Sequence, residues 1–279
     1  MANQRSPISP TAHYTGAVWA SNGLSHPAFH SAAGGLMYNA MRLPMAITKA
    51  LGGTKLEELL LARHRLLDRR LERAIESGEV SQVIEIAAGL SARGWRFSRR
   101  YGNRITYVET DLPEMVALKR RALREAGSIG PHHRVVTLDA LQGKGEQSLG
   151  AIAATLDRER GLAIVSEGLL SYLERDAVID LWRRAAGTLS AFRSGVMLSD
   201  LHLTGDNDSL VTAIGIRLLS TFVRGQVGFH FADRAEAVAA LKGAGFADAV
   251  LRSGSEASRA PGARSIHVIE AETRSAETR

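Results

Sequence analysis

Two acidic residues, Glu109 and Asp111, stand at the end of the apolar run 105–109, about 20 residues after a turn of small residues. An acid placed there in a doubly wound fold can accept hydrogen bonds from both hydroxyls of a ribose, and a carboxylate suits two donors. The two residues alternate along an extended chain and so share a face. Either of them could therefore bind a nucleoside.

The next two apolar runs end in the same way. Residues 135–138 lead into Asp139 and Ala140, and residues 162–165 lead through Ser166 into Glu167. Asp139 could accept a hydrogen bond from the amino group of an adenine. If these runs are parallel strands, their carboxyl ends meet at one edge of the sheet, which is where ligands of open α/β sheets bind.

The turn before these acids reads Ala-Ala-Gly-Leu at 87–90 and follows the apolar run 82–87. Small residues at Ala87 and Gly89 let a ligand approach the backbone, and the start of the next helix supplies unpaired amides. The glycine pattern of dinucleotide-binding turns is not met, because Ala87 stands where the first glycine would be. A tight turn without a ligand is an equally weighted interpretation.

The elements that would position these residues are strands that alternate with helices. Short runs rich in Val and Ile predict strands at 82–87, 105–109, 135–138, 162–165, 196–201, 249–251 and 266–269. Helical periodicity predicts helices at 56–75, 113–125, 174–192 and 234–243. This alternation predicts an α/β, Rossmann-like fold, a mostly parallel seven-stranded sheet with helices on both faces.

The 279 residues are compatible with one domain and an extension. Residues 1–53 are broken by prolines yet carry Tyr14, Trp19 and Tyr38, so we expect an N-terminal helical lid over a domain at 54–270, with a flexible tail at 271–279. The three aromatic side chains could form a wall for a flat ligand or simply pack. Arg217 and Arg224 could attract an anionic ligand to a second wall.

Composition excludes several classes of protein. There is no cysteine, which removes disulfides and thiolate metal sites, and we expect no metal. The net charge is +6, but the arginines lie at helical spacing beside acids, as at 63–73, so we expect solvated helix faces and consider a nucleic-acid partner unlikely. No targeting segment or membrane-spanning run is present, so we expect a cytoplasmic protein without a membrane partner; its oligomeric state stays open.

Three stretches carry a family resemblance: EIAAGLSAR at 85–93, TDLP at 110–113 and SEGLLSYL at 166–173. They resemble the leucine carboxyl methyltransferase family, which includes the tetracenomycin-type polyketide carboxyl methyltransferases. The resemblance covers roughly residues 56–201. It implies a class I methyltransferase fold and S-adenosyl-L-methionine as the cofactor. Ser91 departs from the family, where many members have aspartate in a G-L-D-T-R stretch, whereas Arg93 is retained.

The resemblance also implies roles for single residues. Arg63 would hold the methionine carboxylate, Gly89 would allow close approach, Asp111 would bind the ribose with Glu109 as the alternative, Asp139 and Ala140 would contact the adenine, and Glu167 would lie beside the methionine amino group. Glu85 and Ala87, within the first stretch, complete the expected cofactor-binding set. Arg63 could also pair with acids on an exposed helix, and Arg93 could cap a helix.

The expected reaction is methyl transfer to an oxygen atom of a small molecule, for which an aromatic or an anionic acceptor is the expectation. A carboxylate acceptor needs no base, whereas a phenol with a pKa near 10 would benefit from one. Tyr172 and His202 are the candidate catalytic residues, and Asp200 lies near His202 in sequence. The alternatives are a non-catalytic S-adenosyl-L-methionine-binding regulatory module, a nicotinamide-dependent oxidoreductase on the same sheet and a nucleic-acid methyltransferase, although the D-P-P-Y or N-P-P-Y tetrapeptide is absent.

Overall fold

A single sheet forms the centre of the molecule. The computed structural model describes residues 10–30, 34–36, 38–39, 56–127, 130–206 and 228–273. The strands are β1 (Gln82–Ile86), β2 (Thr106–Asp111), β3 (His133–Thr137), β4 (Leu162–Ser166), β5 (Gly195–Leu201), β6 (Asp248–Ser253) and β7 (His267–Glu272). They lie in the order β3-β2-β1-β4-β5-β7-β6, and only β7 runs antiparallel to its neighbours. The predicted seven-stranded, mostly parallel sheet is confirmed.

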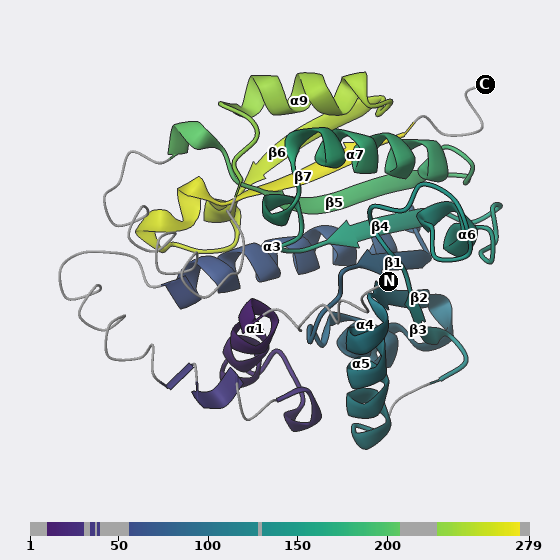
Figure 1. Ribbon diagram of the computed structural model, residues 1–279, viewed down its shortest axis with the longest axis vertical. Coiled ribbons are helices and arrows are strands. Elements are labelled where there is room, and N and C mark those ends of the chain that lie inside the picture. Colours follow the sequence, from purple (N-terminus) through teal and green to yellow (C-terminus); the bar gives the residue numbers. More distant parts are fainter. Residues whose placement is uncertain are drawn as a thin grey trace, which may run out of the picture.

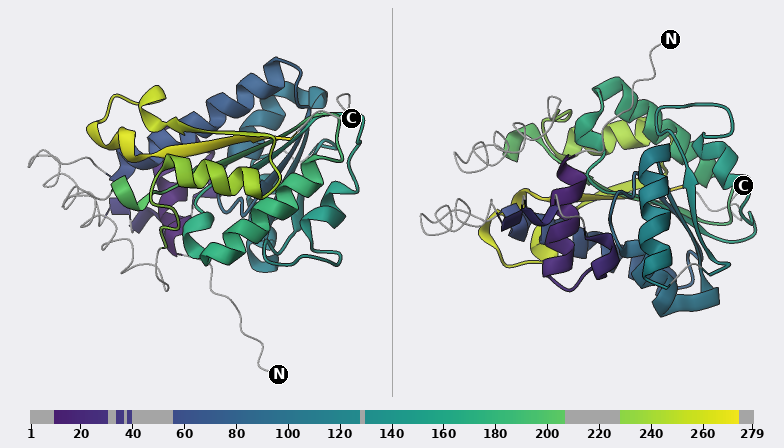
Figure 2. Two further views of the ribbon diagram at one scale, coloured as in Figure 1. Left: turned by 90° about the horizontal axis from the view of Figure 1, so that it is seen from above. Right: turned by 60° about the horizontal axis from the view of Figure 1, so that its bottom comes forward.

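Helices cover both faces of this sheet. The α-helices are α1 (Pro10–Ser21), α3 (Leu56–Glu76), α4 (Arg93–Tyr101), α5 (Pro113–Glu125), α6 (Leu149–Ala153), α7 (Arg175–Leu189) and α9 (Arg234–Gly243). Short 3-10 turns are η1 (Pro27–Phe29), η2 (Gly102–Arg104), η3 (Leu170–Tyr172), η4 (Thr204–Asp206), η5 (Gly254–Glu256) and η6 (Pro261–Ser265). Figure 1 shows α7 and α9 on one side of the sheet and α3 on the other, and Figure 2 shows α7 and α9 side by side.

Alternation along the strands explains the two apolar layers. Val83 and Val165 pack with α3 and α4 on one face, while their neighbours Ile84 and Ile164 pack with α7 on the other. Both sets are almost fully buried, because every second side chain of a strand points to the opposite face. The sheet is therefore held from both sides, and its carboxyl edge is left for loops.

The described part of the N-terminal segment is helical: it contains α1, η1 and the helical residues 34–36 and 38–39. Pro10 starts the 12-residue helix α1, which contacts α3. Tyr14 and Trp19 are buried there against Leu60 and Leu61. The two aromatic residues thus pack against α3. Residues 1–9, most of 31–55, and the tail beyond Thr273 lie outside the described residues, as do Arg217 and Arg224.

The strand boundaries differ from the prediction mainly in β2, β3, β6 and β7. β6 runs to Ser253 instead of Leu251, and β7 runs to Glu272 instead of Ile269, so residues 271 and 272 belong to the sheet and not to a flexible tail. β2 runs to Asp111 instead of ending at Glu109, and β3 starts at His133 instead of Val135. The residues added to β2 are Thr110 and Asp111, and those added to β3 are His133 and Arg134; all four are polar, so an apolar pattern does not mark them. In the described part of the chain, no helix combines the length and apolar character needed to cross a bilayer.

Candidate functional site

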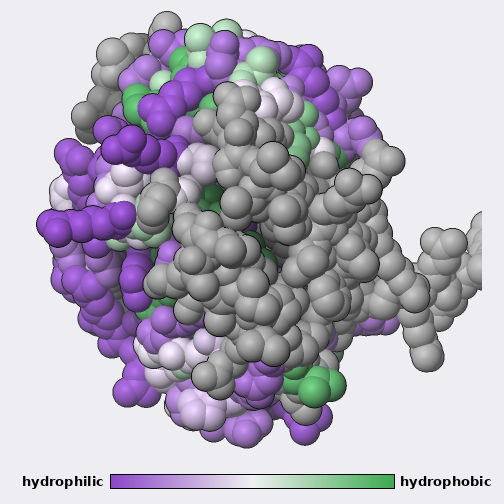
Figure 3. Space-filling model, turned by 90° about the vertical axis from the view of Figure 1, so that its left-hand side faces the viewer, coloured by the Kyte–Doolittle hydropathy of each residue, from purple (hydrophilic) through white to green (hydrophobic). Residues whose placement is uncertain are grey.

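The carboxyl ends of the parallel strands bring most of the expected site residues to one edge. β1, β2, β3 and β4 run parallel and in register, with Glu85 opposite Glu109 and Asp111 opposite Thr137. Figure 3 views the molecule from the side to which the β4 arrow points in Figure 1, and apolar side chains are visible there among polar ones. The common edge predicted from the sequence is therefore present.

The turn between β1 and α4 has an unusual backbone. Ala87 and Gly89 both have positive φ, at 53° and 49°. Alanine rarely adopts this conformation, so the surrounding contacts must hold it. The amide of Gly89 donates to Oδ2 of Asp111 at 2.8 Å, and the amide of Leu112 donates to Oδ1 at 2.8 Å. Burial raises the pKa of Asp111, an effect that these two donors partly offset.

Glu109 lies beneath the turn instead of at its surface. Its carboxylate is fully buried, forms an ion pair with Lys119 and accepts a hydrogen bond from His133 Nε2 at 2.6 Å. Burial opposes its ionisation, but Lys119 and His133 lower its pKa below the usual value. Glu109 is thus enclosed by protein, whereas Asp111, two residues on, is only partly buried at the strand end.

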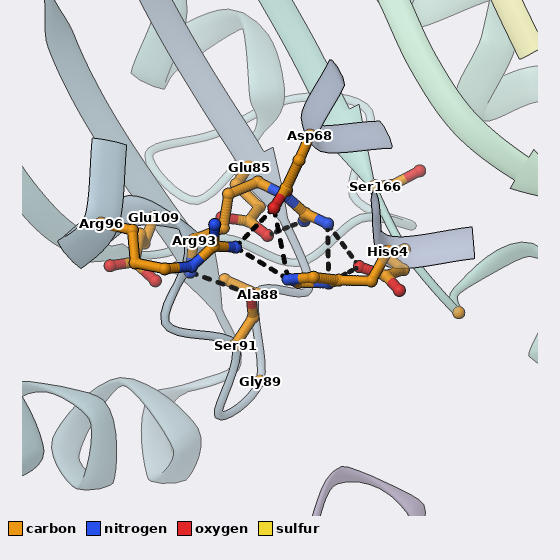
Figure 4. A network of polar contacts seen from close by, with 12 residues as sticks. His64, Asp68, Glu85, Ala88, Gly89, Ser91, Arg93, Arg96, Glu109 and Ser166 are labelled. Carbon is orange, nitrogen blue, oxygen red and sulfur yellow. Dashed lines mark hydrogen bonds and ion pairs between the residues drawn. The ribbon is translucent and has the colours of Figure 1, made fainter. Parts of the chain in front are cut away.

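Arg93 is the centre of a buried ionic network (Figure 4). Its fully buried guanidinium donates to Asp68 on α3 (2.6 Å), Glu85 on β1 (2.6 Å) and Glu167 after β4 (2.5 Å). Three carboxylates raise the pKa of Arg93 well above its usual value, despite the opposing effect of burial. Arg93 therefore ties three elements to α4 instead of capping the helix.

Glu85 belongs to the same network and is enclosed by it. Besides Arg93, its carboxylate accepts a hydrogen bond from the Tyr107 hydroxyl at 2.8 Å. Burial raises the pKa of Glu85, partly offset by Arg93. The structure therefore places Glu85 behind the turn, in contact with Arg93 and not at the outer surface of the site.

Glu167 joins the network to Arg63. Its Oε1 accepts from Arg63 Nε at 3.0 Å, and its Oε2 lies 2.8 Å from His64 Nδ1. Burial opposes ionisation here too, but His64, Arg93 and Arg63 hold the pKa of Glu167 well below its ordinary range. Glu167 is therefore an anion at neutral pH.

Both ring nitrogens of His64 have polar partners. Nε2 lies 2.8 Å from Arg96 Nη2, and Nδ1 lies 2.8 Å from Glu167 Oε2 and 3.0 Å from Arg93 Nη2. The imidazole is therefore enclosed by the same cations and carboxylates that surround Arg93. Trp19 of α1 lies over this imidazole, with ring centroids 4.6 Å apart. The N-terminal helix thus touches the network directly.

Arg63 bridges the ends of β4 and β5. It donates through Nη1 to Asp200 Oδ2 at 3.0 Å, while Asp200 Oδ1 accepts from the Gly168 amide at 2.7 Å. Among the residues that the structure describes, no hydrogen bond uses Nη2 of Arg63. Arg63 is only 8% exposed, so the interpretation of residues 63–73 as a solvated face is wrong for this residue, as it is for His64 and Asp68.

The remaining residues of the predicted set lie in the segments that follow β3, β4 and β5. Asp139 follows β3, and its Oδ1 accepts from the Leu141 amide at 2.9 Å; Ala140, whose carbonyl accepts from Arg184, is partly buried. Tyr172, in η3, is 44% exposed. His202 Nε2 lies 4.0 Å from Asp200 Oδ2, and its ring meets Phe229 edge-on.

Some buried polar residues of this region were not in the predicted set. Asp68, Arg96 and Lys119 read in the sequence as ordinary charges of amphipathic helices. A usable signal exists only for Lys119, which falls on the apolar side of α5 with Met115, Val116 and Ala122. Their partners come from other elements, since Arg96 pairs with Asp68 of α3 and Lys119 pairs with Glu109 of β2, so spacing alone could not identify them.

Comparison with known proteins gives the family. A sequence model described as leucine carboxyl methyltransferase matches residues 26–186. The chain belongs to the leucine carboxyl methyltransferase family. The resemblance seen in the three sequence stretches is thereby confirmed, and the match extends from η1 through most of α7.

Curated relatives are identical to the chain at about a third of the aligned positions. Proteins of Mycobacterium tuberculosis and Frankia alni, both named as S-adenosyl-L-methionine-dependent methyltransferases, are 34% identical over 158 and 141 residues. These matches cover 57% and 50% of this chain, and 50% and 47% of the relatives. The chain spans about half the length of the curated relatives it matches.

Solved structures share the fold. A methyltransferase structure from Thermobifida fusca aligns with a TM-score of 0.67 at 15% identity, over 98% of this chain and 100% of that one. Human N-acetylserotonin methyltransferase, solved with S-adenosylmethionine, aligns with a TM-score of 0.50 at 15% identity, over 96% and 68%. The predicted class I methyltransferase fold is confirmed.

Proposed function

We propose that the protein is an S-adenosyl-L-methionine-dependent methyltransferase that methylates an oxygen atom, of a carboxylate or a hydroxyl group, on a small molecule. Family membership and the names of the relatives support the cofactor. The observation that carries the proposal is the pair formed by Asp111 and the positive-φ residue Gly89 at the end of β2. It offers a partly accessible carboxylate beside a partly accessible turn of the backbone, as a nucleoside site requires.

The polar groups of the site fit this cofactor. Asp111 has an additional lone pair on each oxygen with which to accept from ribose hydroxyls. Arg63 can direct Nη2 toward the methionine carboxylate, and Glu167 supplies negative charge for the amino group. Asp139 and Ala140 would meet the adenine. When bound, S-adenosyl-L-methionine supplies a methyl group on a positively charged sulfur, which an acceptor oxygen can attack.

The roles of Ala87, Glu85 and Glu109 differ from those of the direct contacts. Ala87 and Gly89 shape the turn, while Glu85 and Glu109 hold the cations beneath it. We therefore assign the ribose to Asp111 rather than to Glu109. The proposed contribution of the protein to catalysis is alignment of the acceptor oxygen with the methyl group, since displacement requires close approach along one line.

The acceptor side offers one group suited to taking up a proton. His202 lies near Asp200, which Arg63 and the Gly168 amide hold in place. Such a histidine would assist a hydroxyl acceptor, whereas a carboxylate acceptor would need no base. Tyr172 stands at the same end of the sheet and is accessible for contact with an acceptor.

Three expectations stay predictions: the segment 1–53 as a lid, the domain at 54–270 and a cytoplasmic location.

Isothermal titration tests the cofactor. The wild-type protein should bind S-adenosyl-L-methionine and S-adenosylhomocysteine, and Asp111→Ala should weaken both by about tenfold or more, because a hydrogen bond to a charged group contributes about 1.5–3 kcal/mol. Glu114→Ala is the matched control, since it removes an exposed acid three residues further on. NADH, added to the wild type, should produce no binding heat.

The outcomes separate the alternatives. If NADH binds and neither S-adenosyl-L-methionine nor S-adenosylhomocysteine does, the oxidoreductase is favoured. If none of the three binds to well-folded wild-type protein, the methyltransferase proposal is contradicted. If the cofactor binds, an acceptor screen should start with aromatic and polyketide carboxylates and measure formation of S-adenosylhomocysteine. Binding with no turnover on any acceptor would favour the regulatory module. A salt-dependent affinity for nucleic acid would instead favour the nucleic-acid methyltransferase.

A further inference from the structure

Lys119 is an almost fully buried ammonium group whose partners all lie around the turn between β1 and α4. It is 1% exposed, and its Nζ donates to the carbonyl of Gly89 at 3.0 Å and to the carbonyl of Ser91, with Ala88 O at 3.4 Å. Its ion pair with Glu109 completes the set. Three protons thus meet two close carbonyls and one carboxylate, so the hydrogen-bonding capacity of the ammonium group is used.

The hydrogen bonds to carbonyls determine where the amides of the turn point. In a trans peptide, C=O and N–H point in opposite directions. The carbonyl of Ala88 accepts from the Ser91 amide at 3.0 Å and lies 3.4 Å from Lys119 Nζ, so the amide of Gly89 in the same peptide unit points the other way and meets Asp111 at 2.8 Å. Asp111 therefore holds this peptide unit through its amide, while Lys119 holds the carbonyls of Gly89 and Ser91 in the same turn.

The surroundings are shaped to keep this cation in place. Glu109 neutralises it and is itself fixed by His133. Gly94, at the start of α4, leaves room for Glu109, because a Cβ at residue 94 would lie 2.4 Å from Oε1. A buried charge is costly unless it is paired and hydrogen-bonded, and here both conditions are met. The chain thus accommodates a buried ion pair directly beneath the turn.

We propose that Lys119 is a positioning residue for the cofactor: it holds the strained turn 87–91 in the conformation that presents Gly89 and Asp111 to S-adenosyl-L-methionine. This inference rests on the proposed function. It assigns Lys119 no contact with the cofactor, because its ammonium group is enclosed by the turn, Glu109 and α5. Ala87 has a positive φ, a strained conformation for alanine, so the turn needs contacts from neighbouring residues to keep it.

The test compares Lys119→Met with the double variant Lys119→Met/Glu109→Gln. The single variant leaves Glu109 charged with one donor fewer, so its melting temperature should fall. The double variant removes both charges while the glutamine carbonyl can still accept from His133, so its melting temperature should recover toward the wild-type value. Lys242→Met, which removes a half-exposed lysine from α9, is the matched control.

Two measurements on the double variant distinguish positioning from simple packing. Amide hydrogen exchange of the ligand-free protein should accelerate in the segment 87–92 and stay unchanged in β4. The dissociation constant for S-adenosyl-L-methionine should rise about tenfold, a ratio that corresponds to about 1.4 kcal/mol. Lys242→Met should match the wild type in both.

The contrary results are distinct. If amide exchange in residues 87–92 of the double variant is as slow as in the wild type, the turn does not need Lys119. If exchange accelerates but the affinity for S-adenosyl-L-methionine is unchanged, cofactor binding does not need the turn to be held by Lys119. Either result overturns the proposal. Failure of the wild type itself to bind S-adenosyl-L-methionine would remove the proposed function and the role of Lys119 with it. A loss confined to the Lys119 variants leaves the proposed function standing.

Discussion

At the scale of single residues, Arg93 decides how several elements meet. Its guanidinium is fully enclosed and satisfied by carboxylates from α3, β1 and the end of β4. Arginine suits such a position because its planar fork donates in several fixed directions at once. Lysine could not reproduce that geometry. The sequence leaves open whether Arg93 caps a helix, whereas in the structure its buried guanidinium pairs with three carboxylates.

Arg93→Met should lower the free energy of unfolding by about 3–5 kcal/mol, because removing one partner leaves buried carboxylates without their cation. Urea denaturation measures this change. Arg100→Met is the control: Arg100 is about half exposed and pairs with Glu72 and Glu76 at the surface, so its loss should cost less than about 1 kcal/mol. Equal effects of the two substitutions would contradict the importance given to the buried network.

At the scale of elements, α1 packs against α3 and the turn between β1 and α4. Trp19 lies over His64, and Gly16 approaches Leu90, where an added Cβ would lie 3.3 Å from the Leu90 Cβ. α1 thus contacts both the ionic network around Arg93 and the turn between β1 and α4. Because these contacts are local, a change in them should affect the attachment of the helix more than the sheet.

Trp19→Ala should therefore speed limited proteolysis within Pro10–Ser21, since local opening needs fewer contacts to be broken than global unfolding does. Mass spectrometry of the early fragments measures the cleavage site and rate. Leu36→Ala, at a residue 73% exposed, should leave the rate unchanged. If the rate of cleavage rises equally throughout the sheet domain, the contacts of Trp19 stabilise the whole domain and not only the attachment of α1.

The strands and most helices could be predicted because their signals are local. Apolar runs mark β1, β4 and β5, and apolar periodicity marks α3 and α5, whose observed range Pro113–Glu125 matches the prediction. α1 was harder: its buried residues Tyr14, Ala17, Val18 and Trp19 are interrupted by Gly16, and only packing on α3 explains their burial.

The site could be predicted in position but only partly in roles. The common edge of the sheet and the pair Glu109 and Asp111 follow from the alternation of strands with helices and from spacing, whereas the preference for Asp111 comes from the family resemblance. The division of labour between Glu109 and Asp111 does not follow from spacing, since the two residues share a face of β2. It depends on Lys119 and His133, which reach Glu109 from α5 and β3, and such contacts between distant segments leave no periodic pattern in a sequence.

At the scale of the whole molecule, the ionic network links stability to pH. The pKa of Glu167 is held well below its usual value by His64, Arg93 and Arg63 against the effect of burial, and Asp68 is lowered by cations in the same way. A lowered folded-state pKa means that the unfolded chain binds the proton first. This contribution is therefore full above the unfolded value near pH 4.3 and is lost as pH falls through the folded pKa.

Glu167→Gln should accordingly be less stable than the wild type at pH 7, and the difference should shrink below about pH 4.3, where the wild type loses the same contribution. Urea denaturation of both proteins from pH 7 to pH 3 measures the difference. Asp68→Asn should show the same convergence. A difference that stays constant over this range would contradict the lowered pKa of Glu167.

The position of β7 in the sheet has a consequence for synthesis of the chain. β7 lies between β5 and β6, although both of those strands precede it in sequence. A ribosome therefore delivers β5 and then β6 before the strand that joins them, and β6 has no partner in the sheet until His267–Glu272 emerges. Until then one edge of β5 stays unpaired, and a nascent chain in that state offers its backbone to chaperones or to neighbouring chains.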